Sequence, residues 1–104
     1  MAEVGDRFTS GNWTVKSGSE DEFIARWTDF TSWASENFPQ ARFFYLIRSD
    51  ADPRRFVSFG AWTDAGSVDA WRGSPEFAEL MGRCRAVCDD FSPMDSTLVA
   101  TPKG

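Results

Sequence analysis

The chain has 104 residues and a formal net charge of −5, and it contains no histidine. Aromatic side chains are unusually frequent: ten Phe, five Trp and one Tyr outnumber three Leu, two Ile and six Val. This length allows one domain, and this apolar content excludes a disordered chain. The lack of histidine excludes His-based zinc sites, His-ligated haem and catalytic triads with a His base.

Charge and hydropathy also indicate which partners the protein can bind and in which cellular compartment it is found. We expect no nucleic-acid partner, because such binding depends on cationic contacts to phosphate and this chain is acidic. We expect no membrane span, since no run of about 18 apolar residues is present. Residues 1–6 resemble a loose tail and lack the features of a signal peptide, which predicts a cytoplasmic protein with reduced thiols. Cys84 and Cys88 are expected to pack as small apolar residues on one helix face, without a metal.

The first half of the chain predicts a strand, a helix and another strand. Phe8 to Val15 is the first strand, and Lys16-Ser17-Gly18 is a turn. Ser19 followed by Glu22 has the pattern of a capping box that opens a helix. Arg42 to Ser49 then reads as an apolar strand. The helix between them carries a stripe at spacings of three and four, formed by Phe23, Trp27, Phe30, Ala34 and Phe38.

The second half predicts a strand, a broken helix and a last strand. Arg55 to Trp62 pairs with the preceding strand as a hairpin across a short turn. Thr63 or Asp64 caps a short helix, and Ser74 with Pro75 starts a longer one that Asp89-Asp90 closes. The last strand is expected at 94–100.

This order is βαββαβ, the ferredoxin-like arrangement of the α+β class. It predicts a four-stranded antiparallel sheet with helices on one face, in one domain over residues 1–104 with a core of about 8–100. The second and third strands, however, carry apolar residues on both faces, with Phe43, Tyr45 and Ile47 opposite Phe44 and Leu46. A sheet that is apolar on both sides needs a second cover. We therefore expect a homodimer that packs through the free sheet face.

Several segments resemble the antibiotic biosynthesis monooxygenase family of the dimeric α+β barrel superfamily. They are Trp13-Thr14-Val15 to Gly18, Glu22 to Trp27, Phe56 to Trp62, and Trp71 to Phe77. The resemblance covers about residues 8–100. It implies a dimeric barrel with a pocket between the sheet and the helices of each subunit. It also implies a choice among cofactor-free oxygenases of anthrone-type polyketides, haem-degrading enzymes, isomerases of small signalling molecules and proteins of unknown role.

The resemblance can be followed residue by residue. Trp62 matches the Trp that ends the third strand in the quinone-forming members, whereas Ser58 stands where they carry Asn and Val68 where they carry Tyr. Their Arg on the last helix has Arg83 and Arg85 only nearby. The haem-degrading branch uses a His ligand that this chain lacks.

Anthrone oxidation needs a flat aromatic pocket, neutral donors for an enolate and exclusion of water. It needs no organic cofactor or metal, and molecular oxygen is the co-substrate. We therefore name Trp62, Asn12 and Ser58 as catalytic candidates. The candidates for contact with the aromatic substrate are Tyr45, Trp27, Trp71 and Phe59.

Three function classes stay open from the sequence. They are a monooxygenase acting on an aromatic polyketide-like or phenolic molecule, a non-oxidative isomerase or cyclase, and a binding protein without turnover. Each named side chain also has a structural interpretation, such as a core ring or a strand-edge polar group. An enzyme is favoured if Asn12, Ser58 and Tyr45 converge on one cavity beside Trp62.

Overall fold

The computed structural model describes residues 1–103 and contains four strands and three helices. The elements are, in chain order, β1 (Arg7–Val15), α1 (Glu20–Asn37), β2 (Ala41–Arg48), β3 (Arg55–Trp62), α2 (Ala65–Arg72), α3 (Pro75–Ala86) and β4 (Cys88–Thr97). The strands form one antiparallel sheet in the order β2-β3-β1-β4. The predicted ferredoxin-like fold is confirmed, with its second helix broken into α2 and α3.

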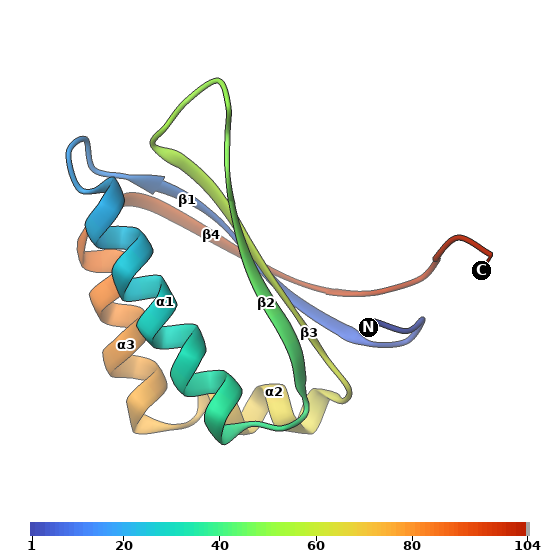
Figure 1. The fold of residues 1–104 in the computed structure, drawn as a ribbon. Helices are drawn as coiled ribbons and strands as arrows, with labels where there is room; N and C mark the ends of the chain where they lie inside the picture. Colours follow the sequence, from blue (N-terminus) through green and yellow to red (C-terminus); the bar gives the residue numbers. More distant parts are fainter. Residues whose placement is uncertain (104) are drawn as a thin grey trace.

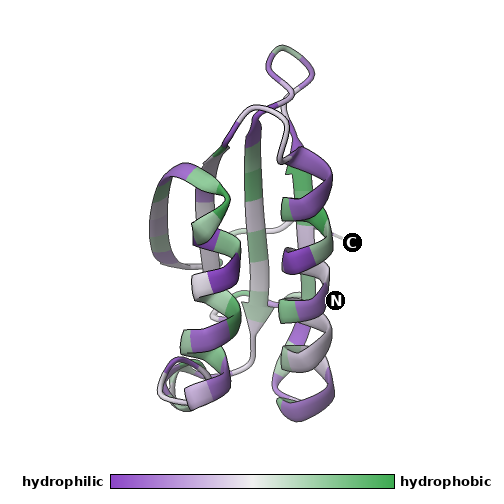
Figure 2. Ribbon diagram, turned by 90° about the vertical axis from the view of Figure 1, so that its left-hand side faces the viewer, coloured by the Kyte–Doolittle hydropathy of each residue, from purple (hydrophilic) through white to green (hydrophobic). Residues whose placement is uncertain are grey.

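All three helices lie on one face of the sheet (Figure 1). Figure 2 shows α1 and α3 side by side across that face, each with alternating hydrophilic and hydrophobic bands. In the part of the chain that the structure describes, no element covers the opposite face (Figure 1). The sheet therefore has an inner face toward the helices and an outer face that is open.

The strand register assigns each side chain to one face. Trp13 on β1 lies opposite Phe56 on β3 and Phe91 on β4, and its ring is 2% exposed. Because side chains alternate along a strand, the neighbours of Trp13 point outward. Trp13 therefore places Gly11 and Thr9 on the inner face.

Two of the three helices begin as the sequence predicts. The side chain of Asp64 accepts a hydrogen bond from the Ser67 amide, and Ser74 caps α3 with Pro75 in its first turn. The capping box predicted at Ser19 is wrong, because its side chain makes no capping hydrogen bond. The backbone at Ser19 is not extended as a capping residue normally is, so its hydroxyl does not reach the helix amides.

The last strand is longer than predicted, and it both begins and ends earlier. The structure places β4 at Cys88–Thr97, so the helix ends at Ala86 and not at Asp89-Asp90. The sequence prediction treated Pro93 as a residue outside a strand. An edge strand tolerates proline because one side of its backbone has no partner, and β4 is an edge strand.

The cysteines consequently do not share one helix face. Cys84 on α3 is fully buried, as expected, whereas Cys88 opens β4 and donates a hydrogen bond from its thiol to the Cys84 carbonyl. Burial raises the pKa of Cys84 to about 12 and that of Cys88 to about 11. Both thiols therefore stay protonated at neutral pH.

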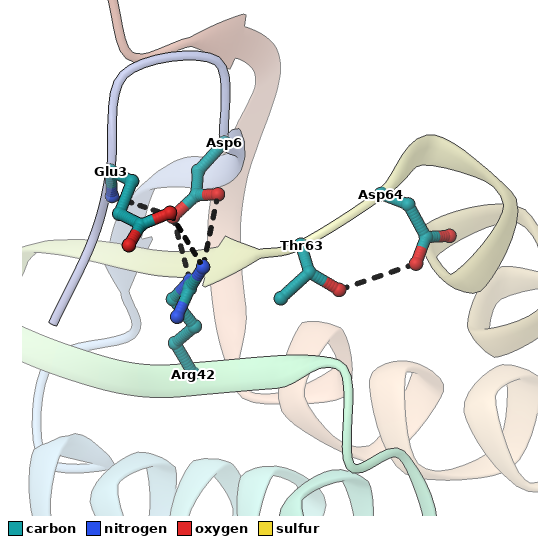
Figure 3. A network of polar contacts seen from close by, with 5 residues as sticks. All are labelled: Glu3, Asp6, Arg42, Thr63 and Asp64. Atoms are coloured by element: carbon teal, nitrogen blue, oxygen red, sulfur yellow. Dashed lines mark hydrogen bonds and ion pairs between the residues drawn. The ribbon is translucent and has the colours of Figure 1, made fainter.

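The expectation of a loose tail at residues 1–6 is also wrong. Asp6 is buried and accepts hydrogen bonds from the Glu3 amide and from Arg42 on β2, with Arg42 Nε 2.7 Å from its carboxylate (Figure 3). Backbone hydrogen bonds join Gly5 and Asp6 to Leu98. These contacts attach the N-terminal segment to β2 and to the residue that follows β4, the two edge strands of the sheet, although no apolar pattern in the sequence indicates them.

Candidate functional site

A cavity of about 340 Å³ lies between the inner sheet face and the helices. All four strands and all three helices contribute to its wall. Eight of its nineteen lining residues are aromatic, and their rings include Trp27, Phe30, Phe44, Trp71, Phe77 and Phe91. A cavity of this size and character suits a small, flat and largely apolar ligand.

Small side chains on the central strands make room for the cavity. Thr9 on β1 and Ser58 and Gly60 on β3 line it from the sheet. A Cβ atom at Gly60 would lie 2.6 Å from Cδ1 of Phe44 and 3.1 Å from the Phe43 carbonyl oxygen. Glycine at position 60 therefore allows the Phe44 ring to lie close against β3 and form part of the wall.

Ser58 supplies a hydroxyl group on the cavity wall. Its Oγ accepts a hydrogen bond of 2.9 Å from Nε1 of Trp13, and this contact fixes the position of the oxygen. A serine hydroxyl can also donate one hydrogen bond. Within residues 1–103 the Ser58 hydroxyl donates to no protein acceptor, so it can donate to a ligand oxygen.

Two buried tryptophans stand next to each other at the end of the cavity nearest α2. Trp62 is fully buried, and its Nε1 donates to Oγ1 of Thr9 at 3.2 Å. The Trp71 ring packs 4.8 Å from the Trp62 ring and lines the cavity. Among the described residues, the buried Nε1 of Trp71 has no hydrogen-bond partner. Trp62 is thus one layer behind the wall and supports both Thr9 and Trp71.

Charged groups lie at the cavity rim. Arg72 at the end of α2 forms a two-pronged ion pair with Asp95 on β4, with N···O distances of 2.7 and 2.5 Å. Arg72 holds the pKa of the Asp95 carboxyl below its usual range, and so both groups are charged at neutral pH. Arg85 on α3 also lines the cavity, and its guanidinium lies 5.7 Å from the centre of the Phe91 ring. No carboxylate within residues 1–103 forms an ion pair with Arg85.

The structure brings part of the predicted site together. Ser58, Trp27 and Trp71 line the cavity, and Trp62 lies directly behind Trp71. Phe59 borders the cavity, although its ring packs on the outer face against Tyr45 at 5.8 Å.

The other two candidates lie elsewhere. Asn12 is exposed opposite Val57 on the outer face, because it follows Gly11 and precedes the inward Trp13. Tyr45 is 55% exposed on the same outer face. The predicted convergence of Asn12, Ser58 and Tyr45 on one cavity does not occur, yet the cavity is not purely apolar either.

Sequence reasoning named Arg85 only as lying near the arginine position of the family, and it missed Thr9, Arg72 and Asp95 on the cavity wall. Alternation from Trp13 could have found Thr9, which lies four residues earlier on the same face. The Arg72–Asp95 pair joins residues that are 23 positions apart, and no spacing in the sequence indicates it. Within residues 1–103, no three Cys, Asp or Glu side chains gather closely enough to hold a metal ion.

The sequence model of the antibiotic biosynthesis monooxygenase family matches residues 9–83. The chain belongs to this family. The resemblance carried by the Trp13, Trp62 and Trp71 segments is thereby confirmed. A search among curated proteins finds no significant match. None of the helices among residues 1–103 combines the length and apolar character needed to cross a lipid bilayer.

Solved structures of other proteins have the same fold. SnoaB, a cofactor-independent oxygenase from Streptomyces nogalater, superimposes with a TM-score of 0.85 at 18% identity, over 94% of this chain and 97% of its own. A putative antibiotic biosynthesis monooxygenase from Caulobacter crescentus gives 0.80 at 15% identity, over 95% and 92%. Another from Nitrosomonas europaea gives 0.80 at 14% identity, over 93% of each chain. At these identities the likeness establishes the fold, and the family membership supports a monooxygenase-type function.

Proposed function

We propose that this protein is a cofactor-independent monooxygenase that oxidises a phenolic or polyketide-like aromatic molecule with molecular oxygen. The observation that carries the proposal is the ring-walled cavity with the Ser58 hydroxyl on its wall and Arg85 at its rim. Family membership and the similarity to SnoaB, which is described as a cofactor-independent oxygenase, support it. The two free thiols, Cys84 and Cys88, suit the reducing cytoplasm, where we place the reaction.

The reaction that fits this cavity oxidises an anthrone-type methylene carbon to a carbonyl. Loss of one proton from that carbon gives an enolate, whose carbanion form transfers electrons to dioxygen. One oxygen atom becomes the new carbonyl, and the other leaves as water with the two hydrogens of the methylene group. The substrate supplies all four electrons needed to reduce dioxygen, so the overall equation balances without a further reductant.

The protein residues bind and orient the substrate in this scheme. The aromatic wall holds the flat ring system and excludes water from the carbanion. The Ser58 hydroxyl, fixed by Trp13, donates to the enolate oxygen. Arg85 balances the negative charge from the rim. Trp62 keeps Thr9 and Trp71 in place through its hydrogen bond and ring contact.

Oxygen consumption with the anthrone dithranol tests this function. We expect the protein to accelerate oxidation above the spontaneous rate, and Ser58→Ala to lower kcat by roughly 100-fold, as for loss of one oxyanion donor. Ser35→Ala removes a hydroxyl from the exposed side of α1 and should leave the rate unchanged. No acceleration by the natural protein would overturn the proposal.

Two further variants locate the site. Trp62→Phe keeps an aromatic ring but loses the hydrogen bond to Thr9, so we expect a lower kcat with the fold retained. Asn12→Ala changes a side chain on the outer face. A loss in Asn12→Ala as large as that in Ser58→Ala would move the site away from this cavity.

We also propose that two copies of the chain pair through their outer sheet faces. Four rings, Phe8, Phe43, Tyr45 and Phe59, contact one another there at 4.9 to 6.5 Å between centres. Tyr45, Ile47 and Met94 are each more than half exposed on this face. Burial of such a surface against its own copy removes apolar area from water. Light scattering should give twice the 11.7 kDa chain mass at micromolar concentration, and a mass near 11.7 kDa would contradict the dimer.

A further inference from the structure

A second hollow of about 200 Å³ lies beside the aromatic cavity, between α2 and the β1–β4 strand pair. Its wall includes Val68 and Asp69 of α2, Arg7 of β1 and Thr97 of β4. The aromatic cavity and this second hollow share three lining residues, which are Thr9, Arg72 and Asp95. The two spaces are therefore neighbours along one pair of strands.

The shared residues form a bridge from the helix layer to the sheet. Asp95 lies directly opposite Thr9 in the β1–β4 register, and Arg72 reaches it from the end of α2. The next inward-facing pair of residues on these strands is Arg7 and Thr97, which belong to the second hollow alone. The Arg72–Asp95 pair thus stands where one space ends and the other begins.

Neither Arg72 nor Asp95 is a buried charge that requires a partner for the protein to fold. The side chains of Arg72 and Asp95 are 34% and 62% exposed, so water screens the attraction between their charges. The geometry of the pair is nevertheless specific, because each of the two terminal guanidinium nitrogens donates to a different carboxylate oxygen. A well-defined bridge between the helix layer and the sheet can separate the two spaces that lie on either side of it.

We propose that the Arg72–Asp95 pair is a partition that limits the length of the aromatic ligand. The proposal rests on the proposed function, which supplies the ligand class. An apolar ring that extended past this point would have to separate the two charges and offer neither of them a hydrogen bond. We expect three linearly fused rings to lie within the aromatic cavity and a fourth ring to cross the partition. Removal of the pair would join spaces of about 340 and about 200 Å³ and would admit the longer ligand.

The test is a comparison of two ligands on two double variants. Arg72→Ala/Asp95→Ala removes both charges, so neither is left without a partner. Arg83→Ala/Glu79→Ala is the matched control, because this 2.8 Å pair on α3 lines neither space. Quenching of tryptophan fluorescence gives the Kd for dithranol, with three rings, and for its linear four-ring analogue.

In the natural protein we expect dithranol to bind more tightly. The Arg72→Ala/Asp95→Ala variant should shift the ratio of the two Kd values by about tenfold toward the four-ring ligand, as for a change in pocket fit. The control should keep the natural ratio. The single variant Asp95→Ala removes only the half of the bridge on the sheet, and it should shift the ratio in the same direction by a smaller factor.

Other outcomes overturn the partition in different ways. A ratio unchanged in both partition variants, or equal binding of both ligands by the natural protein, overturns the partition and leaves the proposed function standing. No binding of either ligand by any of the proteins overturns the partition together with the proposed aromatic site. Circular dichroism on each variant shows that the comparison is made between folded proteins.

Discussion

The two faces of the same sheet are built from similar residues but differ in what they enclose. On β2, Phe44 points inward to the cavity wall, whereas the adjacent Tyr45 points outward and is 55% exposed. On the inner face, Trp13 and Trp62 donate their indole N–H groups to hydroxyl acceptors. The outer face carries a cluster of rings that lacks any cover within residues 1–103 (Figure 1). The inner face thus lines a cavity, whereas the outer face leaves its rings open to solvent.

The largest effect is expected from the inner face. Trp62→Ala should lower the free energy of unfolding by about 3–5 kcal/mol, because it deletes a fully buried ring and leaves a cavity. Chemical denaturation at a fixed protein concentration measures this loss. Val99→Ala, at a position that is 81% exposed, should change the value by less than about 0.5 kcal/mol. A small loss in Trp62→Ala would mean that the inner rings do not form the core.

A charge placed on the outer face should act on assembly and leave the fold intact. Ile47 is 54% exposed in the single chain, so Ile47→Asp costs little until a second copy covers it. Burial of an unpaired carboxylate at the interface then weakens the dimer, and we expect its Kd to rise at least about 100-fold. Light scattering over a dilution series gives the Kd, with Glu36→Ala on α1 as the control. An unchanged Kd would show that the outer face is not the dimer interface.

Two variants on neighbouring strands, Ser58→Ala and Asn12→Ala, test whether side-chain hydrogen bonds stabilise the inner face more than the outer face. Ser58→Ala leaves the nearly buried Trp13 indole N–H without its acceptor, which costs about 1–3 kcal/mol of unfolding free energy. Asn12→Ala, one residue from Trp13 but on the outer face, should cost less than about 0.5 kcal/mol. Thermal and chemical denaturation of both variants measure the contrast. Equal losses of unfolding free energy in the two variants would show that side-chain hydrogen bonds stabilise both faces to the same extent.

Local patterns in the sequence predicted the fold. The site, in contrast, is formed by contacts between residues that lie far apart in the sequence. Local patterns such as the stripe from Phe23 to Phe38 and the strand that ends at Trp62 predicted the element order. The start of β4 was missed because Pro93 resembles a strand terminator until its edge position is known. The cavity wall depends on register, since it is register that brings Asp95 opposite Thr9.

The placement of Asn12 shows the limit of reasoning from neighbours in the sequence. Adjacent residues on a strand point to opposite faces, so a polar residue beside a core tryptophan lies away from that core. Ser58 reaches Trp13 from a different strand, across 45 positions of sequence. Composition could name the residue types that the chemistry requires, but only the pairing of β1 with β3 selects Ser58 over Asn12.

The smallest effect concerns the edge of the sheet where β2 begins. The Glu3 amide and Arg42 hold the pKa of the Asp6 carboxyl below its usual range (Figure 3). A carboxyl whose pKa is lower in the folded state stabilises the protein above its unfolded pKa, near 3.9 for Asp, and this contribution is lost as the pH falls. Asp6→Asn should therefore lower the Tm at about pH 7, and this effect should shrink as the pH falls through the lowered pKa that Asp6 has in the folded state.

Glu76→Gln, an exposed position in the first turn of α3, is the control for loss of one negative charge. Arg42 lies at the register shift between Ala41 and Phe43, and so its contact with Asp6 fixes the start of the strand that carries Phe43 and Tyr45. If Asp6→Asn also weakens the dimer while Glu76→Gln does not, the N-terminal segment helps to position the outer face. If only the Tm changes, the segment supports the fold alone, and the outer face depends on its own side chains.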